Sequence, residues 1–375
     1  MTAPTEKRRV FSGIQPTGRL HVGNYLGALR LWAELQRSYD CIFCVADLHA
    51  LTVPGAVPPE RLRRKIVETA ALVLACGIDP HRSVVFVQSR VSAHAELAWL
   101  LSCATPVGWL ERMTQYKAKA GRLTAASAAL LVYPVLQAAD ILLYKSHLVP
   151  VGEDQKQHIE LARDIAQRFH GLYGEVFVIP EPLIRPGGAR IMGLDDPAAK
   201  MSKSLAETRL GHAIGLTDSP DAIRRAVMRA VTDSGNEVRF DRASPGVRNL
   251  LEIYTALSGQ GPAEAEARFA GRGYGRLKRE VADVAIAALR PFREEYERLM
   301  RDPDALDRGL VEGADRARSI ADATLEEVKR LVGLAEAKTP AARGRAGTSG
   351  RSGRGDTGER HAVRSAAGVP REEGG

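Results

Sequence analysis

Two lysines three positions apart mark the most distinctive segment of the chain, the pentapeptide KMSKS at residues 200–204. Lysine side chains on a serine-containing loop can cover a triphosphate and neutralise the negative charge that builds on a departing pyrophosphate. A solvated basic loop would account for either lysine alone, but not for the whole string. The segment therefore predicts a site at which a nucleoside triphosphate is cleaved.

A second segment with phosphate-binding features lies near the start of the chain, VFSGIQPTGRLHVGNYLGAL at residues 10–29. Its order of apolar run, Gly/Pro loop and helical pattern places free backbone N–H groups and the positive end of a helix beside a bound phosphate. Gly13, Gly18 and Gly23 would let a nucleotide approach the backbone closely. The alternative is an ordinary strand-to-helix turn in which His21 and Asn24 only cap the helix.

One acidic residue stands out because its surroundings are apolar. Asp140 carries the only formal charge in residues 123–143, and a carboxylate in such a setting is costly unless a hydrogen-bond donor meets it. A ligand group that can only donate, such as an indole N–H, would suit it, and a phenyl ring in its place would leave the carboxylate unpaired. Asp140 is therefore a candidate for ligand selection.

The elements that must position these residues follow an α/β pattern. Short apolar runs at residues 10–14, 41–45, 84–87 and 176–179 look like strands, because unbroken runs of this length suit a sheet that is covered on both faces. Helical stretches separate them, for example at residues 59–76. This alternation predicts a parallel α/β sheet with right-handed crossovers.

After about residue 216 the pattern becomes helical. Apolar residues such as Ile223 and Val227 recur at helical spacing, and Ser219 and Pro220 supply a cap and a first turn. The last segment is rich in Gly, Arg and Ser and has few large apolar side chains to stabilise a fold. We expect a catalytic domain with an inserted helical region in residues 1–195, the lysine segment with a helical domain in 196–336, and a disordered tail in 337–375.

The formal net charge of +8 suggests a polyanionic partner such as RNA, although ordinary surface charge would also explain it. About half of the charge lies in residues 338–375, which contain eight Lys/Arg and four Asp/Glu, a difference of four. Four cysteines are too few for a disulfide framework, and the pair Cys41 and Cys44 suits core packing. The sequence shows neither a secretion signal nor a membrane-spanning run, so we expect a cytoplasmic protein.

KMSKS together with HVGN at residues 21–24 resembles the class I aminoacyl-tRNA synthetases, in which a HIGH-type element and a KMSKS loop hold ATP on a Rossmann-like sheet. Asn24 stands where many members have a second histidine, a departure that the tyrosine and tryptophan subgroup tolerates. LVPVGEDQKQHIELARDIAQRF at residues 148–169 looks like the bacterial tryptophanyl-tRNA synthetase family, as do FSGIQPTG, ERMTQYKAK, YPVLQAADILLY and GARIMGL. The resemblance covers residues 10 to about 335.

The resemblance also implies site residues. Two loops, the lysine segment and one residue beside adenine would bind ATP: Gln15, Pro16, Thr17, Gly23, Asn24, Gly152, Glu153, Asp154, Ile191, Lys200, Met201, Ser202, Lys203 and Ser204. The residues that would assist catalysis are His21, Lys119, Lys200 and Lys203. In the implied tryptophan pocket Asp140 meets the indole nitrogen, and the pocket is completed by Phe11, His49, Tyr133, Gln137, Val149, Val151 and Gln155.

The implied activity is that of a tryptophan–tRNA ligase, which activates L-tryptophan with ATP to tryptophanyl-adenylate and then transfers it to tRNA(Trp). The implied partners are Mg²⁺ bound with ATP, tRNA(Trp) and a second copy of the chain, and no membrane. A carboxylate substrate is already ionised at neutral pH, so activation needs no general base.

Gln137 departs from the family pattern, because bacterial tryptophan enzymes usually carry methionine at this position. Together with Asp140 it could bind a phenol hydroxyl, so a tyrosyl-tRNA synthetase-like specificity is the main alternative. The GEDQKQH run argues against tyrosine. Outside the class, the alternative is a nucleotidyltransferase that does not act on RNA.

Overall fold

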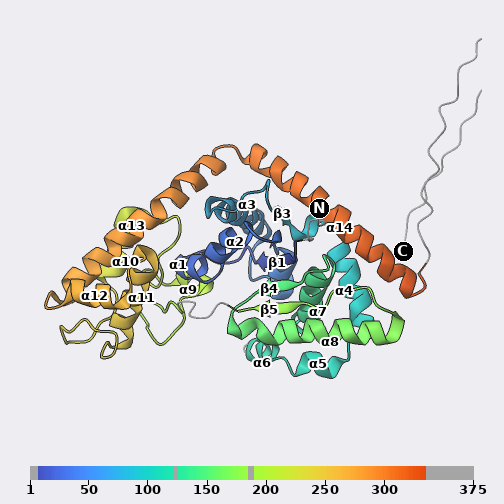
Figure 1. Ribbon diagram of the computed structural model, residues 1–375, viewed down its shortest axis with the longest axis horizontal. Coiled ribbons are helices and arrows are strands. Elements are labelled where there is room, and N and C mark those ends of the chain that lie inside the picture. Colours follow the sequence, from blue (N-terminus) through green and yellow to red (C-terminus); the bar gives the residue numbers. More distant parts are fainter. Residues whose placement is uncertain (1–6, 122–125, 185–189, 335–375) are drawn as a thin grey trace, which may run out of the picture. The chain divides into compact units, whose positions relative to one another are not determined.

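The computed structural model describes residues 7–121, 126–184 and 190–334, without the side chains of Lys119 and Ala120 (Figure 1). Strands in these ranges form one sheet: β1 Arg9–Ile14, β2 Asp40–Val45, β3 Val84–Val87, β4 Leu148–Pro150 and β5 Glu181–Leu183. All neighbouring pairs are parallel, in the order β3-β2-β1-β4-β5. The predicted parallel α/β sheet is confirmed, and its strand order is that of a Rossmann-like, doubly wound fold.

Helical segments connect and follow the strands. Those up to β5 are α1 Val22–Asn24, the π turn η1 Tyr25–Leu29, α2 Arg30–Leu35, η2 Leu48–Thr52, α3 Pro59–Ala75, η3 Gln88–Arg90, α4 Ala93–Ala104, α5 Val107–Glu111, α6 Thr114–Ala120, α7 Ala128–Leu142, η4 Glu153–Gln155 and α8 Lys156–Tyr173. Those after β5 are α9 Lys203–Thr208, α10 Pro220–Met228, α11 Pro245–Ser258, α12 Pro262–Phe269, α13 Gly273–Met300 and α14 Pro303–Leu331. The run α1-η1-α2 is unbroken and contains a π turn, a feature frequent at functional sites.

Alternate residues of the strands face two separate cores. In β2, Phe43 shares one core with Trp32 of α2, and the two rings stack with their centroids 4.7 Å apart. Ile42 and Cys44 belong to the other core, to which α4, α7 and α8 contribute. Cys41 lies in the first core, so the two cysteines point to opposite faces of the sheet. Helices therefore cover both faces, and the CxxC spacing reflects core packing as expected.

Three of the predicted strands are confirmed and the fourth is wrong. β1, β2 and β3 match the predicted runs to within one residue. Residues 176–179 form no strand; Phe177 instead packs against Phe169 of α8, with the ring centroids 5.2 Å apart. The apolar character of this run is thus explained by burial against a helix, and the strand β5 begins two residues later.

The region after residue 216 is helical, as predicted. The Ser219 hydroxyl accepts a backbone hydrogen bond and caps α10. Ile223 and Val227 of α10 are buried in one core with residues of α11 and α13. Val231 continues the apolar spacing but is exposed, because α10 ends three residues before it.

The two longest helices pack back toward the sheet. α13 contacts α3 as well as α10 and α11, and α14 contacts β3 and α4. In the described ranges, no helix combines the length and the apolar character needed to cross a lipid bilayer. The predicted disordered tail, residues 337–375, lies outside the described residues, and the domain boundary at residue 195 stays a prediction.

Gly313 allows α14 to lie directly against the edge strand β3. A Cβ atom at this position would overlap the backbone carbonyl of Val85 in β3. The contact joins the backbone of α14 to the backbone of β3, so neither side can move aside as the end of a flexible side chain would. A helix that covers an edge strand also protects its backbone from pairing with other chains.

We expect Gly313→Ala to lower the free energy of unfolding by about 1–3 kcal/mol, because the added methyl group overpacks the contact with Val85. Gly309→Ala is the matched control, since Gly309 is exposed on the same helix with nothing within 4 Å of its missing Cβ. This control should stabilise the protein by about 0.5–1 kcal/mol. Urea unfolding of both variants measures the difference, and equal effects would contradict the proposed contact.

Candidate active site

The strand order places the two predicted nucleotide loops at one crevice. From β1 the chain proceeds to β2 and β3 on one side and later to β4 and β5 on the other, so the order reverses between β1 and β4. Ligands of such sheets bind in the crevice at the carboxyl ends of the strands beside this switch point. Gln15 directly follows β1, and Gly152 follows β4 by two residues. The loops that carry them therefore flank the crevice.

The lysine segment docks on the first loop. Lys203 Nζ donates a hydrogen bond to the carbonyl oxygen of Gln15 (2.7 Å), and the backbone N–H of Arg19 donates to the carbonyl oxygen of Lys203 (3.1 Å). Gly18 has φ +69°, and a Cβ atom there would lie 2.7 Å from the carbonyl carbon of Lys203. Glycine is thus required at residue 18 both by its backbone conformation and by the approach of Lys203.

The five residues of the lysine segment are partly regular structure. Lys200 forms an isolated antiparallel bridge with Met192, so the segment starts in an extended conformation. Ser202 then caps α9 by accepting a hydrogen bond from the backbone N–H of Leu205 (3.3 Å). The prediction of a loop is therefore wrong for its last two residues, because Lys203 and Ser204 already belong to α9.

Burial and positive charge shift the pKa values of Lys203 and His21, where the lysine segment approaches α1. Burial lowers the pKa of Lys203 to about 8, although Glu207 opposes the shift. Burial, followed by the positive charge of Lys203 and of other neighbours, lowers the pKa of His21 to about 3. The His21 ring is therefore neutral at pH 7. An anionic ligand would offset the positive charge of Lys203 beside it.

The capping alternative for His21 and Asn24 is only half correct. Asn24 Oδ1 accepts a hydrogen bond from the backbone N–H of His21 (3.1 Å), which is a capping contact. The His21 ring, in contrast, is buried and neither of its nitrogens has a hydrogen-bond partner among the described residues. Gly23 lies close to Ile191, since a Cβ atom on Gly23 would be 3.6 Å from the Ile191 Cβ atom. The structure thus brings these predicted ATP residues together.

The second loop carries exposed carboxylates at the start of α8. Glu153 and Asp154 lie in the 3-10 turn that precedes α8, and both are exposed. No side-chain hydrogen bond caps either η4 or α8. Ile159, Ala162 and Ile165 lie on the buried face of α8. Asp154 Oδ2 accepts a hydrogen bond from Gln155 Nε2 (3.4 Å). Helix capping therefore does not account for these exposed carboxylates.

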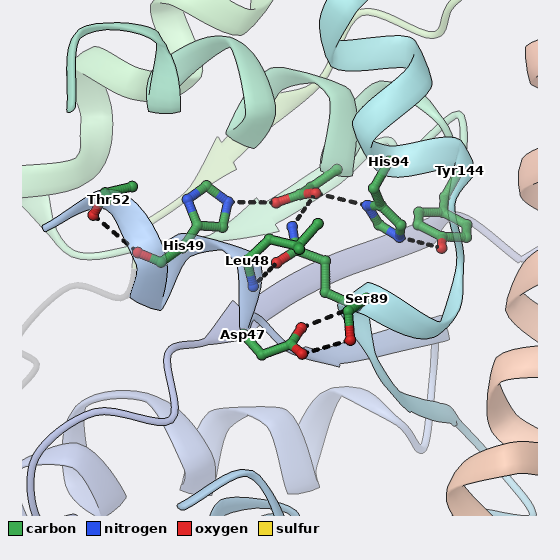
Figure 2. A network of polar contacts seen from close by, with 9 residues as sticks. Asp47, Leu48, His49, Thr52, Ser89, His94 and Tyr144 are labelled. Atoms are coloured by element: carbon green, nitrogen blue, oxygen red, sulfur yellow. Dashed lines mark hydrogen bonds and ion pairs between the residues drawn. The ribbon is translucent and has the colours of Figure 1, made fainter. Parts of the chain in front are cut away.

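Asp140 is the centre of a buried polar network (Figure 2). Its side chain is almost fully enclosed, with 4 % of the residue surface exposed. Oδ1 accepts hydrogen bonds from Gln88 Nε2 and His94 Nδ1, both at 2.6 Å, and Oδ2 lies 2.8 Å from His49 Nε2. Burial alone would raise the pKa of Asp140, but the hydrogen bonds from both histidines outweigh it and lower the pKa to about 2.

Two members of this network were not predicted as site residues. Gln88 lies directly after β3, and its Oε1 also accepts a hydrogen bond from the backbone N–H of Leu48 (3.2 Å). His94 joins Asp140 to the Tyr144 hydroxyl, which is 2.8 Å from its Nε2. The sequence signal for Gln88 was its place at the carboxyl end of a parallel strand. His94 has no comparable sequence signal, because only its tertiary contact with Asp140 marks it.

The aromatic residues predicted around the indole lie beside this network. Tyr133 lies about two helical turns before Asp140 on α7, and its hydroxyl is 3.0 Å from His158 Nε2. The Tyr133 and His49 rings meet edge-on, and burial raises the pKa of Tyr133 to about 12. Phe11 of β1 stacks on Tyr144 with the ring centroids 5.5 Å apart. Aromatic rings from α7, η2 and β1 thus converge near Asp140.

The remaining predicted pocket residues occupy neighbouring elements. Val149 is buried in β4, and Val151 and Gln155 are partly buried in the following loop and turn. Gln137 is partly buried on α7, one turn before Asp140. The side chain of Lys119 lies outside the described residues.

Comparisons with known proteins agree with this geometry. Residues 3–290 match the family model described as tRNA synthetases class I (W and Y). The tryptophan–tRNA ligase of Caldanaerobacter subterraneus subsp. tengcongensis is 53% identical over 328 residues, 87% of this chain and 98% of that protein. Tryptophan–tRNA ligase 2 of Streptomyces avermitilis is 48% identical over 338 residues, 89% of this chain and 99% of that protein.

A solved structure shows the same fold. The tryptophanyl-tRNA synthetase of Campylobacter jejuni, crystallised in complex with ADP and tryptophan, has a TM-score of 0.76 and 36% identity, covering 87% of this chain and 100% of that one. The family-model match, residues 3–290, extends over the sheet, both loops and the helices α9 to α12. The chain therefore belongs to the class I tRNA synthetases of the tryptophan and tyrosine family, and within that family to the tryptophan–tRNA ligases.

Proposed function

We propose that the crevice between β1 and β4 activates L-tryptophan with ATP and that the activated amino acid is then transferred to tRNA(Trp). The observation that carries this proposal is the bonding of the Asp140 carboxylate. A carboxylate offers about four acceptor positions, and protein donors fill two on Oδ1 and one on Oδ2. The position that remains on Oδ2 suits the indole N–H, which can only donate.

The surroundings of Asp140 support discrimination against other aromatic amino acids. Tyr133, Phe11 and Val149 are buried and supply an apolar wall for a flat ring. We assign His49, Val151, Gln137 and Gln155 to the same pocket, with Gln137 one helical turn from Asp140. A site that hydrogen-bonds its substrate rejects an analogue without the matching donor by factors of about 10⁴–10⁵. Phenylalanine would leave Asp140 with an unfilled position.

We propose that ATP lies across the switch point. The first loop (Gln15, Pro16, Thr17, Gly23 and Asn24) and the second (Gly152, Glu153 and Asp154) flank the nucleotide, and Ile191 lies beside adenine. Lys200, Met201, Ser202, Lys203 and Ser204 then cover the phosphates. The docking of Lys203 on Gln15 supports this arrangement, because it holds a cation at the carboxyl end of β1. The related structure with ADP and tryptophan supports both ligands.

In the first step, a carboxylate oxygen of tryptophan attacks the α-phosphorus of ATP and pyrophosphate leaves. The ionised carboxylate needs no base, so catalysis consists of positioning and charge stabilisation by Lys119, Lys200 and Lys203. His21 is neutral because its pKa is about 3, so its ring can donate one hydrogen bond to a phosphate oxygen without accepting a proton. Mg²⁺ binds with ATP, as this ion is usually held largely by substrate phosphates.

In the second step, a ribose hydroxyl of the terminal adenosine of tRNA attacks the adenylate. We propose that the helical part of residues 196–336 contacts the tRNA and that the chain acts as a homodimer. Two large apolar side chains support a protein interface on consecutive helices: Trp99 of α4 is 71% exposed and Val107 of α5 is 58% exposed. Aromatic residues such as Trp99 are enriched at protein interfaces relative to the rest of the surface.

ATP–pyrophosphate exchange with each of the twenty amino acids tests the first step. We expect exchange with tryptophan only, because tyrosine offers no indole N–H to Asp140. Omission of Mg²⁺ should abolish the signal. Exchange with tyrosine, or with no amino acid at all, would refute the assigned pocket.

The pH dependence of exchange tests the role of Lys203. The pKa of Lys203 is about 8 in the free protein, so kcat/KM for ATP should fall as the pH rises through about 8 and the cation is lost. Bound phosphates favour the charged form, so the fall in kcat should occur at higher pH. In Lys203→Arg the guanidinium stays charged. An unchanged alkaline limb in this variant would exclude Lys203 as its source.

Sedimentation of Trp99→Arg tests the dimer. We expect the wild-type chain to sediment as a dimer at micromolar concentration and the variant to sediment as a monomer, because a buried arginine without a partner is costly at an interface. Leu210→Arg is a matched control. Leu210 is likewise a large exposed apolar side chain, but it lies on the segment after α9. A dimeric Trp99→Arg variant would place the interface elsewhere.

A further inference from the structure

The extended segment at residues 190–194 separates two sides of the molecule. Arg190 and Met192 line a cavity together with residues of α11, such as Asn249. Ile191 points to the opposite side. Its Cβ atom would lie 3.6 Å from a Cβ atom added to Gly23. Because side chains alternate along an extended chain, position 193 faces the same side as Ile191. This is the side on which the proposed ATP site lies.

The ring of His212 fills the space beside position 193. A Cβ atom on Gly193 would overlap the His212 ring and would lie 2.7 Å from its Nδ1. The backbone carbonyl of His212 also accepts a hydrogen bond from the N–H of Leu194 (2.9 Å). His212 is therefore attached to the segment on the Ile191 side, and its residue surface is 0% exposed.

Asp195 fixes the tautomer of the His212 ring. Asp195 Oδ1 lies 2.5 Å from His212 Nδ1. An ionised carboxylate can only accept, so Nδ1 carries a proton, and in the neutral form of the ring Nε2 presents a lone pair. That Nε2 atom is buried and has no hydrogen-bond partner among the described residues. A buried polar atom without a partner costs free energy unless a ligand or water supplies one.

His212 and His21 lie close together at this place. Both ring nitrogens of His21 are buried without a hydrogen-bond partner among the described residues, as is Nε2 of His212. The backbone pairing of His21 with Gly215, three residues after His212, brings the two segments side by side. Unpartnered nitrogens from two histidines thus gather where Gly23, Ile191 and the lysine segment meet.

We propose that His212 is a further nucleotide-binding residue, whose Nε2 accepts a hydrogen bond from a donor on the nucleoside part of ATP. The donor is a ribose hydroxyl or the adenine amino group. Phosphate oxygens are excluded as partners of the neutral ring, because they carry lone pairs and no proton. The inference rests on the proposed function, since it requires ATP to bind on the Ile191 side.

Two amide variants separate the two ends of the ring. In His212→Asn the amide nitrogen takes the place of Nδ1 and keeps the bond to Asp195, but nothing reaches the position of Nε2. In His212→Gln the longer side chain reaches that position and its oxygen can accept. We expect KM for ATP in pyrophosphate exchange to rise about tenfold in His212→Asn and to stay within about threefold of wild type in His212→Gln. KM for tryptophan should change less than about twofold in both.

ATP analogues identify the donor. The candidates are 2′-deoxy-ATP, 3′-deoxy-ATP and the triphosphate of purine riboside, which lacks the amino group. The analogue without the contacted donor should bind less tightly than ATP to the wild-type protein but as tightly as ATP to His212→Asn. If no analogue behaves this way, or if KM for ATP is no higher in His212→Asn than in His212→Gln, the proposal is overturned. A wild-type protein without tryptophan-dependent exchange would instead refute the proposed function itself.

Discussion

The site depends on charged and polar groups that are kept away from water. Asp140 and His21 are buried and Lys203 is partly buried, and each loses free energy by burial unless another group offsets the cost. The protein supplies the offset for Asp140 through three donors, and its pKa falls. For Lys203 and His21 the offset is incomplete, and both pKa values are lowered. The Asp140 side of the site is therefore already paired within the protein, whereas we propose that a ligand completes the side that carries Lys203 and His21.

The parallel sheet explains why these groups meet, although they are far apart in the chain. The carboxyl ends of β1, β2, β3 and β4 share one edge of the sheet. Gln15, His49, Gln88 and Gly152 each follow one of these strands within a few residues. α7 then brings Asp140 to the same edge, and the lysine segment reaches it by docking on Gly18. One topological feature thus positions both the predicted nucleotide loops and Asp140.

The sequence was sufficient for the parts of the fold that depend on local pattern. β1, β2 and β3 contain apolar runs of four or five residues, and Ser219 is a cap with a clear motif, so these were predicted correctly. β4 has only three residues and pairs with β1 by a single register position, so its local pattern was too short to identify. The run at 176–179 was misread because burial against α8 and burial in a sheet select the same apolar residues. Asp140 was recognised from its apolar surroundings, but the need for Gln88 and His94 arises only from tertiary contacts.

Two glycines show most clearly that tertiary contacts cannot be predicted from local sequence pattern. Gly18 and Gly193 lack side chains because other residues occupy the space, the main chain of Lys203 at the first and the ring of His212 at the second. From sequence, Gly18 suggested close approach of a nucleotide, and Gly193 suggested nothing. Both contacts instead hold the lysine segment in place. The first contact joins Lys203 to the loop after β1, and the second lies beside Asp195, which precedes the segment. Because the two contacts bracket Lys200 and Lys203, the placement of these cations is set by packing between distant parts of the chain rather than by the pentapeptide itself.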